Sequence, residues 1–268
     1  MIVLKNVIIT GGTRGIGLSM AREFLKSGCN VTVCGRTEES LIKCEEELIE
    51  HKGRVQFLIC DVMDKFQIER IWFQAKDRWR NIDIWINNAG KNCSYELLWN
   101  TEDRFVEQVI DTNIKGVIYG SKIAAKYMIE QGDGQIWNME GLGSDGRMIE
   151  KTILYGTSKR AVTYFTKALA KELADTSVKI GRLSPGMMLT DFITKSPDGS
   201  DSKAIEEESF KKIFNILGDK PETVAKFLVP RMLKNGKNNA HIQWLTTFKV
   251  TRRFITAKFS KNKRVLIE

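Results

Sequence analysis

The chain has 268 residues, 42% hydrophobic and 28% charged, a balance that excludes a disordered or collagen-like chain and predicts a folded core. Four prolines and the lack of a glycine- or serine-rich linker predict a single domain over residues 1–268. The five cysteines form no C-x-x-C pair and there are only two histidines. We therefore expect no metal site and reduced thiols in the core.

The two ends of the chain differ in character. Met1–Thr10 is a short apolar run that Lys5 and Asn6 interrupt, which predicts neither a signal peptide nor a membrane span. We expect the protein to reside in the cytoplasm, or in the stroma if this is a mature organellar form. The net charge is +9, and residues 240–268 hold seven Lys or Arg against one Glu. No zinc-finger or RNA-binding signature accompanies this basic end, so we do not expect nucleic acid as a partner.

Apolar β-type runs alternate with longer helical patterns along the chain. Strands are predicted at Val7–Thr10, Asn30–Cys34, Val55–Cys60, Ile82–Asn87, Gln135–Met139 and Val178–Ser184, with Ala240–Leu245 as a candidate last strand. Helices are predicted near Arg14–Ser27, Glu38–Lys52, Asp64–Trp79, Thr101–Gln131 and Thr157–Asp175. This alternation predicts an α/β fold with one doubly wound parallel sheet of the Rossmann type.

A glycine-rich loop follows the first predicted strand and precedes a helix. Glycines let the chain turn tightly and let backbone N–H groups approach a pyrophosphate, to which the helix N-terminus adds its positive end. A purely structural turn is the alternative, but the strand–loop–helix context favours a dinucleotide site. The expected pyrophosphate contacts are Gly11, Thr13, Arg14, Gly15, Ile16 and Gly17.

The end of the second strand indicates which dinucleotide binds. NAD-binding folds usually place an acid here for the ribose hydroxyls, but this chain has Arg36 followed by Thr37. Arg36 and Arg14 together can clamp a 2′-phosphate, and Thr37 can add a hydroxyl donor. We therefore predict NADPH as the cofactor. The alternative is that both arginines are ordinary solvated surface residues.

Further motifs follow the later strands in a fixed order. They are Asp61-Val62, the N-N-A-G run through Asn88, Ala89 and Gly90, then Asn113, Tyr155 and Lys159 as Y-x-x-x-K, and Pro185, Gly186, Met188 and Thr190. This ordered set resembles the short-chain dehydrogenase/reductase superfamily. The resemblance implies that the first pair holds the adenine, that the last group holds the nicotinamide, and that Asn113 orders a water of the proton relay. Cys93, just after N-N-A-G, is a weaker candidate for lining a pocket.

Tyr155 and Lys159 are the predicted proton-transfer pair. Residues i and i+4 share one face of a helix, so the Lys159 ammonium can lie beside the phenol. A neighbouring cation would lower the pKa of Tyr155 from about 10 toward working pH, which suits a donor to a carbonyl oxygen. In the superfamily the same lysine also holds the nicotinamide ribose.

One position departs from the superfamily pattern. Most members carry a serine after the fifth strand that hydrogen-bonds the substrate carbonyl, and here that position is Gly141. Ser144 lies three residues later and is the candidate replacement, together with backbone N–H groups of the turn. We interpret the glycine as room for the edge of a wide, flat substrate. On that interpretation Gly141→Ser would affect a bulky pigment more than a small aldehyde.

The sequence around this departure resembles that of one subfamily. The run from Asn138 to Arg147, N-M-E-G-L-G-S-D-G-R, is similar to the N-M-D-G-x-G-S-D-G-R loop of chlorophyll b reductases. The similarity continues through Tyr155–Arg160 and Leu183–Met187. It then extends into the tail through Phe214–Leu217, Glu222–Ala225, Leu228–Pro230 and residues 262–268. The resemblance implies reduction of the formyl group of chlorophyll b, or of its phytol-free form, by NADPH.

Two other functions stay open at this stage. One is an NADPH-dependent carbonyl reductase for another bulky apolar aldehyde or ketone, and the other is a nucleotide-binding scaffold that has lost catalysis. The expected partners are an apolar small molecule, with a tetrapyrrole favoured, and further copies of the chain in a homo-oligomer. Residues 191–220 are expected to form a variable segment on the substrate side.

Residues 246–268 form a basic C-terminal extension. Phe248, Ile255 and Phe259 fall on one side of a helix of period 3.6, with Lys249 and Arg252 elsewhere around it. Such a helix can lie on a membrane surface or close over an apolar ligand. The alternative is that its apolar side packs on the body or on a second subunit.

Overall fold

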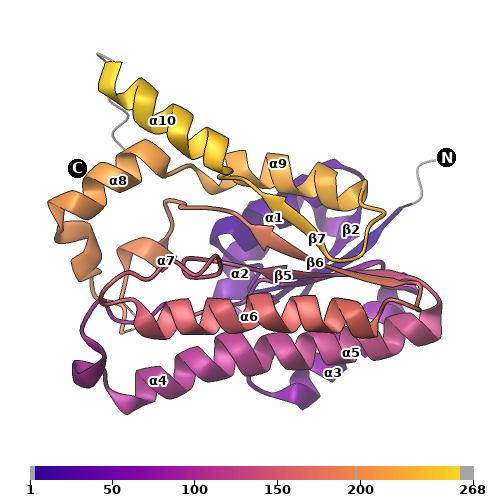
Figure 1. Ribbon diagram of the computed structural model, residues 1–268. Helices are drawn as coiled ribbons and strands as arrows, with labels where there is room; N and C mark the ends of the chain where they lie inside the picture. Colours follow the sequence, from indigo (N-terminus) through magenta and orange to yellow (C-terminus); the bar gives the residue numbers. More distant parts are fainter. Residues whose placement is uncertain (1–3, 197, 260–268) are drawn as a thin grey trace.

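A seven-stranded parallel sheet forms the centre of the computed structural model, which describes residues 4–196 and 198–259 (Figure 1). The strand order is β3-β2-β1-β4-β5-β6-β7, and every neighbouring pair is parallel. The predicted Rossmann-type sheet is confirmed, including its last strand. The strands are β1 Asn6–Thr10, β2 Asn30–Gly35, β3 Val55–Ile59, β4 Ile84–Asn87, β5 Gly134–Met139, β6 Val178–Ser184 and β7 Ala240–Gln243.

Helices cover both faces of the sheet, which explains why the central strands are apolar throughout. One core contains side chains of α1 (Gly15–Lys26), α2 (Glu38–Glu47) and α9 (Pro221–Leu233). The other contains side chains of α3 (Lys65–Trp79), α5 (Gly116–Gln131) and α6 (Ile153–Glu172). Successive residues of β1 alternate between these cores, because side chains on a strand point to opposite faces.

The long helix predicted at Thr101–Gln131 is interrupted. It is α4 (Asp103–Ile110), one π-helical turn at Asp111–Lys115, and then α5. The predicted helix at Glu38–Lys52 is likewise shorter, because α2 ends at Glu47 and a 3-10 helix, Ile49–Arg54, follows. Periodicity in the sequence does not distinguish a π turn from an α turn, since both keep the chain helical. π turns are frequent at functional sites, and Asn113 lies in the middle of this one.

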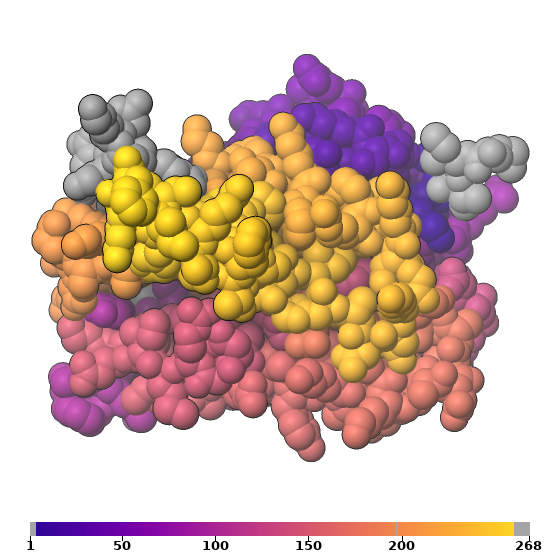
Figure 2. Space-filling model, turned by 45° about the horizontal axis from the view of Figure 1, so that its top comes forward, coloured from indigo at the N-terminus to yellow at the C-terminus, as the bar shows by residue number. Residues whose placement is uncertain are grey.

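Segments at the carboxyl side of β6 close one end of the sheet (Figure 1). They are α7 (Asp191–Thr194), a 3-10 helix at Lys203–Glu206 and α8 (Glu208–Leu217), which together occupy the predicted substrate-side segment. After β7 the chain forms α10 (Thr247–Phe259), which packs on α8 and lies on the surface of the molecule (Figure 2). Residues 260–268, part of the predicted extension and of the tail resemblance, lie outside the described residues. Among the described helices, none has the length and apolarity that crossing a bilayer requires.

Candidate active site

The glycine loop lies at the carboxyl end of β1 and is built for close backbone approach. Gly11 has φ +60°, and a Cβ added there would lie 2.7 Å from the Cα of Ala89. A Cβ at Gly17 would lie 2.3 Å from the carbonyl oxygen of Gly11. Only glycine therefore allows this loop to fold against the N-N-A-G segment, whose Asn88 donates to the carbonyl oxygens of Thr10 (3.0 Å) and Gly11 (2.8 Å).

The N-terminus of α1 supports an anion site beside this loop. Its first turn has neither a capping side chain nor an acidic residue, so its N–H groups are not satisfied by the side chains of that turn. Thr190, from the segment after β6, lies on the other side of the loop, 3.3 Å from where a Cβ on Gly15 would be. The first and last of the predicted cofactor segments thus meet.

Cations gather where the 2′-phosphate is expected. Arg14 and Arg36 are both exposed, and Arg14 lies 3.6 Å from the exposed carboxylate of Asp191. The oxygen of Thr37 accepts from the N–H of Ser40 and caps α2. Burial, followed by the nearby Arg36, lowers the pKa of Lys91. Lys91 was not singled out in the sequence, although its place directly after N-N-A-G was a usable signal.

The adenine-side residues lie at the end of β3. The carboxylate of Asp61 accepts from the N–H of Met63 (3.0 Å) and is partly exposed, so it can accept from a further donor. Val62 is buried against Gly116, where an added Cβ would lie 2.9 Å from the Val62 side chain. Close packing of the start of α5 on this turn fixes its position.

Tyr155, Lys159 and Asn113 are brought together by the start of α6 and the π turn. The Lys159 ammonium lies 5.7 Å from the centroid of the Tyr155 ring and donates to the carbonyl oxygen of Met139 (3.0 Å). Asn113 is fully buried and donates to Ser158 (3.0 Å) and to the carbonyl oxygen of Lys91 (2.9 Å). The π turn therefore aims Asn113 at the N-N-A-G loop and at α6 at once.

The chain matches the family model described as short chain dehydrogenase over residues 5–201. It belongs to that family. The model covers β1 through α7, and therefore the whole arrangement of the glycine loop, Asn113, Tyr155 and Lys159. The family prediction made from the motifs is confirmed.

Relatives of this short-chain dehydrogenase include two rice proteins, both from Oryza sativa subsp. japonica. Chlorophyll(ide) b reductase NOL, chloroplastic, is 36% identical over 96% of this chain and 76% of its own length. Probable chlorophyll(ide) b reductase NYC1, chloroplastic, is 35% identical over 94% of this chain. The chain spans about half the length of NYC1, at 52%.

Solved structures with the same fold hold the predicted cofactor. ElxO with NADP bound has a TM-score of 0.78 and 30% identity, over 93% of this chain and 100% of that one. The closed form of serine dehydrogenase complexed with NADP+ has a TM-score of 0.79 and 26% identity, over 91% and 95% of the two chains. These neighbours agree with the dinucleotide site predicted from the glycine loop.

The protonation states of this short-chain dehydrogenase differ from the sequence-based expectation. Burial, with a smaller contribution from Cys93, raises the pKa of Tyr155 instead of lowering it. Burial also lowers the pKa of Lys159 to about 8, although the negative charge of Glu140 partly opposes that change. The expectation was wrong because it counted the cation and not the loss of water around both groups. A phenol that stays protonated at neutral pH is nevertheless the form required of a proton donor.

Gly141 makes room for Tyr155 itself. A Cβ added at Gly141 would lie 2.3 Å from the Tyr155 hydroxyl oxygen, 3.0 Å from its Cζ and 3.2 Å from the Cγ of Lys159. Ser144 is buried, accepts from the N–H of Gly141 (3.1 Å) and donates to the carbonyl oxygen of Lys159 (3.3 Å). The Ser144 hydroxyl thus bonds the backbone of the loop and of α6. A glycine is therefore needed at position 141 to accommodate Tyr155, whatever the width of the substrate.

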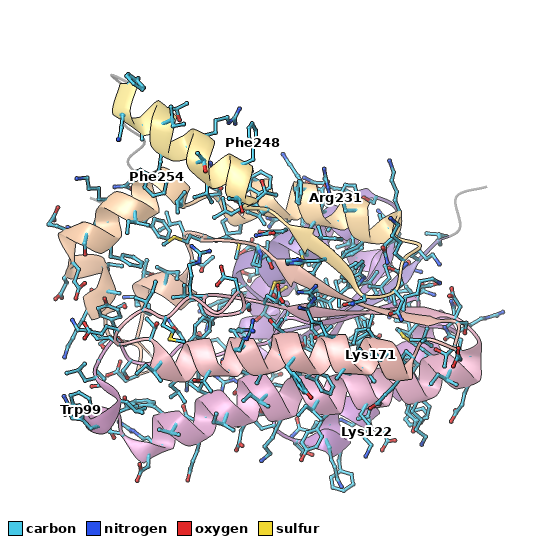
Figure 3. The ribbon with its side chains drawn as sticks, viewed as in Figure 1. Trp99, Lys122, Lys171, Arg231, Phe248 and Phe254 are labelled. Atoms are coloured by element: carbon cyan, nitrogen blue, oxygen red, sulfur yellow. The ribbon has the colours of Figure 1, made fainter. Side chains whose placement is uncertain are left out.

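Apolar side chains pack against Tyr155. Cys93 lines a small pocket, as was expected of it, and packs with Tyr155 in one small core. The other residues of this pocket are apolar (Leu98, Ile153 and Leu154) and polar or charged (Ser94, Glu96, Thr101 and Lys151). Phe192 of α7 contacts the Tyr155 ring edge-on at 5.6 Å between centroids. Exposed apolar side chains also occur after β4 and β5, interspersed with exposed charged and polar ones; the apolar ones are Trp99 (Figure 3), Leu142, Met148 and Ile149. Phe192 was missed in the sequence, where nothing distinguished it from other apolar residues.

Replacement of Gly141 tests the contact with Tyr155. We expect Gly141→Ala and Gly141→Ser each to lower kcat at least about 100-fold, because a displacement of the proton donor by about 1 Å has that effect. A small aromatic aldehyde and a bulky pigment should be affected alike, since the clash is within the protein. Gly156→Ala is the matched control, because its Cβ would meet only an ordinary contact at 3.8 Å. A selective loss on the bulky substrate would contradict this account and restore the one based on substrate width.

Proposed function

We propose that this chain is an NADPH-dependent reductase that converts the formyl group of chlorophyll b, or of chlorophyllide b, to a hydroxymethyl group. The observation that carries the proposal is the match to the NOL reductase over 96% of the chain, which extends well beyond the segment shared by the family. The apolar side chains that pack against Tyr155, among them Phe192, are compatible with an apolar substrate. The chloroplast names of the relatives support a stromal setting in a photosynthetic host.

The chemistry divides between cofactor and protein. NADPH, when bound, supplies the hydride that reaches the formyl carbon. Tyr155 donates its proton to the formyl oxygen, so that aldehyde, hydride and proton together give the alcohol. Lys159 places a positive charge beside the phenolate that remains, and Asn113 holds the N-N-A-G loop and α6 at a fixed separation. The N–H groups of Gly141 and Ser144 bond within their turn, so those of Leu142 and Gly143 are the remaining backbone donors for the oxygen, in the absence of the usual serine.

The decisive assay is reduction of chlorophyllide b with NADPH, followed by the absorbance of the pigment. We expect turnover by the wild type and a loss of at least about 1000-fold in Tyr155→Phe, with NADPH affinity nearly unchanged, because only the proton donor is removed. Tyr164→Phe is the matched control, since Tyr164 lies on the same helix but is 77% exposed. Wild-type turnover by Tyr155→Phe would refute the mechanism.

The same assay separates the remaining functions. Reduction of other bulky ketones with a higher kcat/KM than chlorophyllide b would favour the more general carbonyl reductase. Failure to oxidise NADPH with any aldehyde would favour a nucleotide-binding scaffold without catalysis.

Cofactor preference tests the two arginines. We expect tighter binding of NADPH than of NADH by at least about tenfold, because charged hydrogen bonds to the 2′-phosphate each contribute about 1.5–3 kcal/mol. Arg36→Ala should remove most of this preference, and Arg231→Ala, an exposed arginine on α9, should leave it intact. Fluorescence titration of both cofactors measures the two affinities. Equal affinities in the wild type would contradict the assignment of the 2′-phosphate site.

We further propose that α10 contacts a membrane surface. Its inner face is held to the body by Arg253, which forms two bonds to the buried carboxylate of Asp219, at 2.7 and 3.0 Å. Phe248 (Figure 3), Ile255 and Phe259 lie on the opposite side of the helix and are 78%, 53% and 82% exposed. The alternative that this apolar side packs on the body is therefore wrong.

The composition of α10 favours a lipid surface as its partner. Arg252 and Lys258 are exposed on either side of the apolar row, and no acidic residue lies in the helix. Apolar side chains flanked by cations suit an anionic bilayer, where the rings enter the interface and the cations meet headgroups. A substrate that resides in a membrane would then be close to the site.

Vesicle flotation tests this contact. We expect binding to phosphatidylglycerol vesicles, weaker binding to phosphatidylcholine, and a loss of at least tenfold in the double variant Phe248→Ser, Phe259→Ser, since burial of each ring contributes about 1.5–3 kcal/mol. Phe66→Ser on α3, 69% exposed in the wild type, is the matched control. Unchanged flotation of the double variant would refute the contact, and loss of a dimer in that variant would identify a second subunit as the partner.

We also propose that the chain associates with further copies of itself in a homo-oligomer. The outer side of α5 exposes Ile129, at 46%, and offers a surface for a second copy.

A further inference from the structure

Glu140 is a buried carboxylate directly before Gly141, and its side chain is 3% exposed. It lies at the carboxyl end of β5, where parallel neighbours bring β6 and β7 alongside. Isolated buried carboxylates are costly, so one that is retained must be paired and hydrogen-bonded. The donors around it show which parts of the molecule it joins.

Four side chains from three elements surround the Glu140 carboxylate. Thr163 of α6 donates to it at 2.8 Å, and Arg182 of β6 at 3.2 Å. Ser184 at the end of β6 also donates to it, and the Nε2 of His241 in β7 lies 3.0 Å from it. Glu140 therefore ties the ends of β5, β6 and β7 to α6.

The segment that Glu140 fixes touches the proton-transfer pair on both sides. Met139, before it, accepts the hydrogen bond of the Lys159 ammonium through its carbonyl oxygen. Gly141, after it, is the residue whose lack of a side chain leaves room for the Tyr155 hydroxyl. Thr163 is one helical turn beyond Lys159, so the carboxylate also bonds the helix that carries both groups.

We propose that Glu140 is a positioning residue, whose carboxylate holds the Met139–Gly141 segment against α6 and thereby keeps the Met139 carbonyl oxygen on the Lys159 ammonium. The proposal rests on the function proposed above, in which Lys159 acts as a cation beside Tyr155. No bond of Glu140 to a substrate or to a cofactor is part of it.

Lys159 and Glu140 each lie among groups that favour their charged forms. Lys159 faces the Tyr155 ring and the charge of Glu140, while Glu140 faces Arg182 of β6 and His241 of β7. Burial alone would raise the pKa of Glu140, but hydrogen bonds from His241, Ser184 and Thr163 lower it to about 2. Glu140 is therefore an anion throughout the working range of pH. Burial lowers the pKa of Lys159 to about 8, and the charge of Glu140 keeps it from falling further.

The direct test is the titration of Lys159 by NMR, with lysine labelled at Cε and the signal assigned by its loss in Lys159→Met. Glu140→Gln keeps the size of the side chain and removes its charge. We expect the midpoint of Lys159 to fall by about one pH unit in this variant, because a depressed lysine pKa falls further when its counter-charge is removed. Glu140→Asp should restore most of the wild-type midpoint, since it restores the charge.

A matched control separates charge from hydrogen bonding. Thr163→Val removes one donor to Glu140 but leaves the carboxylate in place, so the Lys159 midpoint should stay within about 0.3 units of the wild type, a small part of the shift that loss of the charge produces. An unchanged midpoint in folded Glu140→Gln would overturn the proposal. If Glu140→Gln does not fold, the double variant Glu140→Gln, Arg182→Gln removes both charges of the buried pair and is compared with Arg182→Gln alone. A lower Lys159 midpoint in the double variant supports the proposal, and equal midpoints overturn it.

Activity gives a second measurement. In Glu140→Gln the basic limb of the kcat profile should move to lower pH by the same amount as the NMR midpoint, whereas general loosening of the fold would lower kcat at every pH. The NMR titration needs neither substrate nor cofactor. A failure of the chlorophyllide b assay would therefore leave it unaffected, and the two proposals can fail separately.

Discussion

The packing of α6 against the carboxyl end of β5 is the contact on which the site depends. Residues 139–144 contact Tyr155 and Lys159 at three points. The Met139 carbonyl accepts from the Lys159 ammonium, the Cα of Gly141 leaves room for the Tyr155 hydroxyl, and the Ser144 hydroxyl donates to the Lys159 carbonyl. Because α6 carries the proposed proton donor and β5 is an interior strand of the sheet, this contact fixes the position of the Tyr155 phenol. The other predicted site residues are arranged around it.

Water exclusion follows from this close packing and determines the electrostatics. The same burial that raises the pKa of Tyr155 lowers that of Lys159, since each group loses the solvation of its charged form. The phenol then keeps its proton at neutral pH, and Lys159, with its pKa lowered to about 8, is still mostly the ammonium. The charge of Glu140 opposes the lowering of the Lys159 pKa by burial. The carboxylate that joins β6 and β7 therefore also affects the protonation of Lys159.

The C-terminal third connects the site to the surface. Asp219 bonds Arg253 of α10 and Trp244, while its backbone bonds Met187 and Leu189, next to the segment expected at the nicotinamide. The position of α10 is thus linked to the segment expected at the nicotinamide by one buried residue, Asp219, through its carboxylate on one side and its backbone on the other. The family model ends at residue 201, so Asp219 and Arg253 lie beyond the part of the chain that it matches.

The sequence by itself determined the sheet, the glycine loop and the order of the motifs, because these depend on local features: apolar period, glycine at tight turns, and spacing on one helix face. It placed Tyr155 beside Lys159 for the same reason. Only the tertiary structure decided what surrounds them. Burial, and so the direction of the Tyr155 pKa, arises from side chains distant in sequence, as do the contact of Gly141 with Tyr155 and the four donors to Glu140. The outward direction of Phe248 was likewise settled by the Arg253–Asp219 pair, since an amphipathic pattern does not say which side of a helix meets the body.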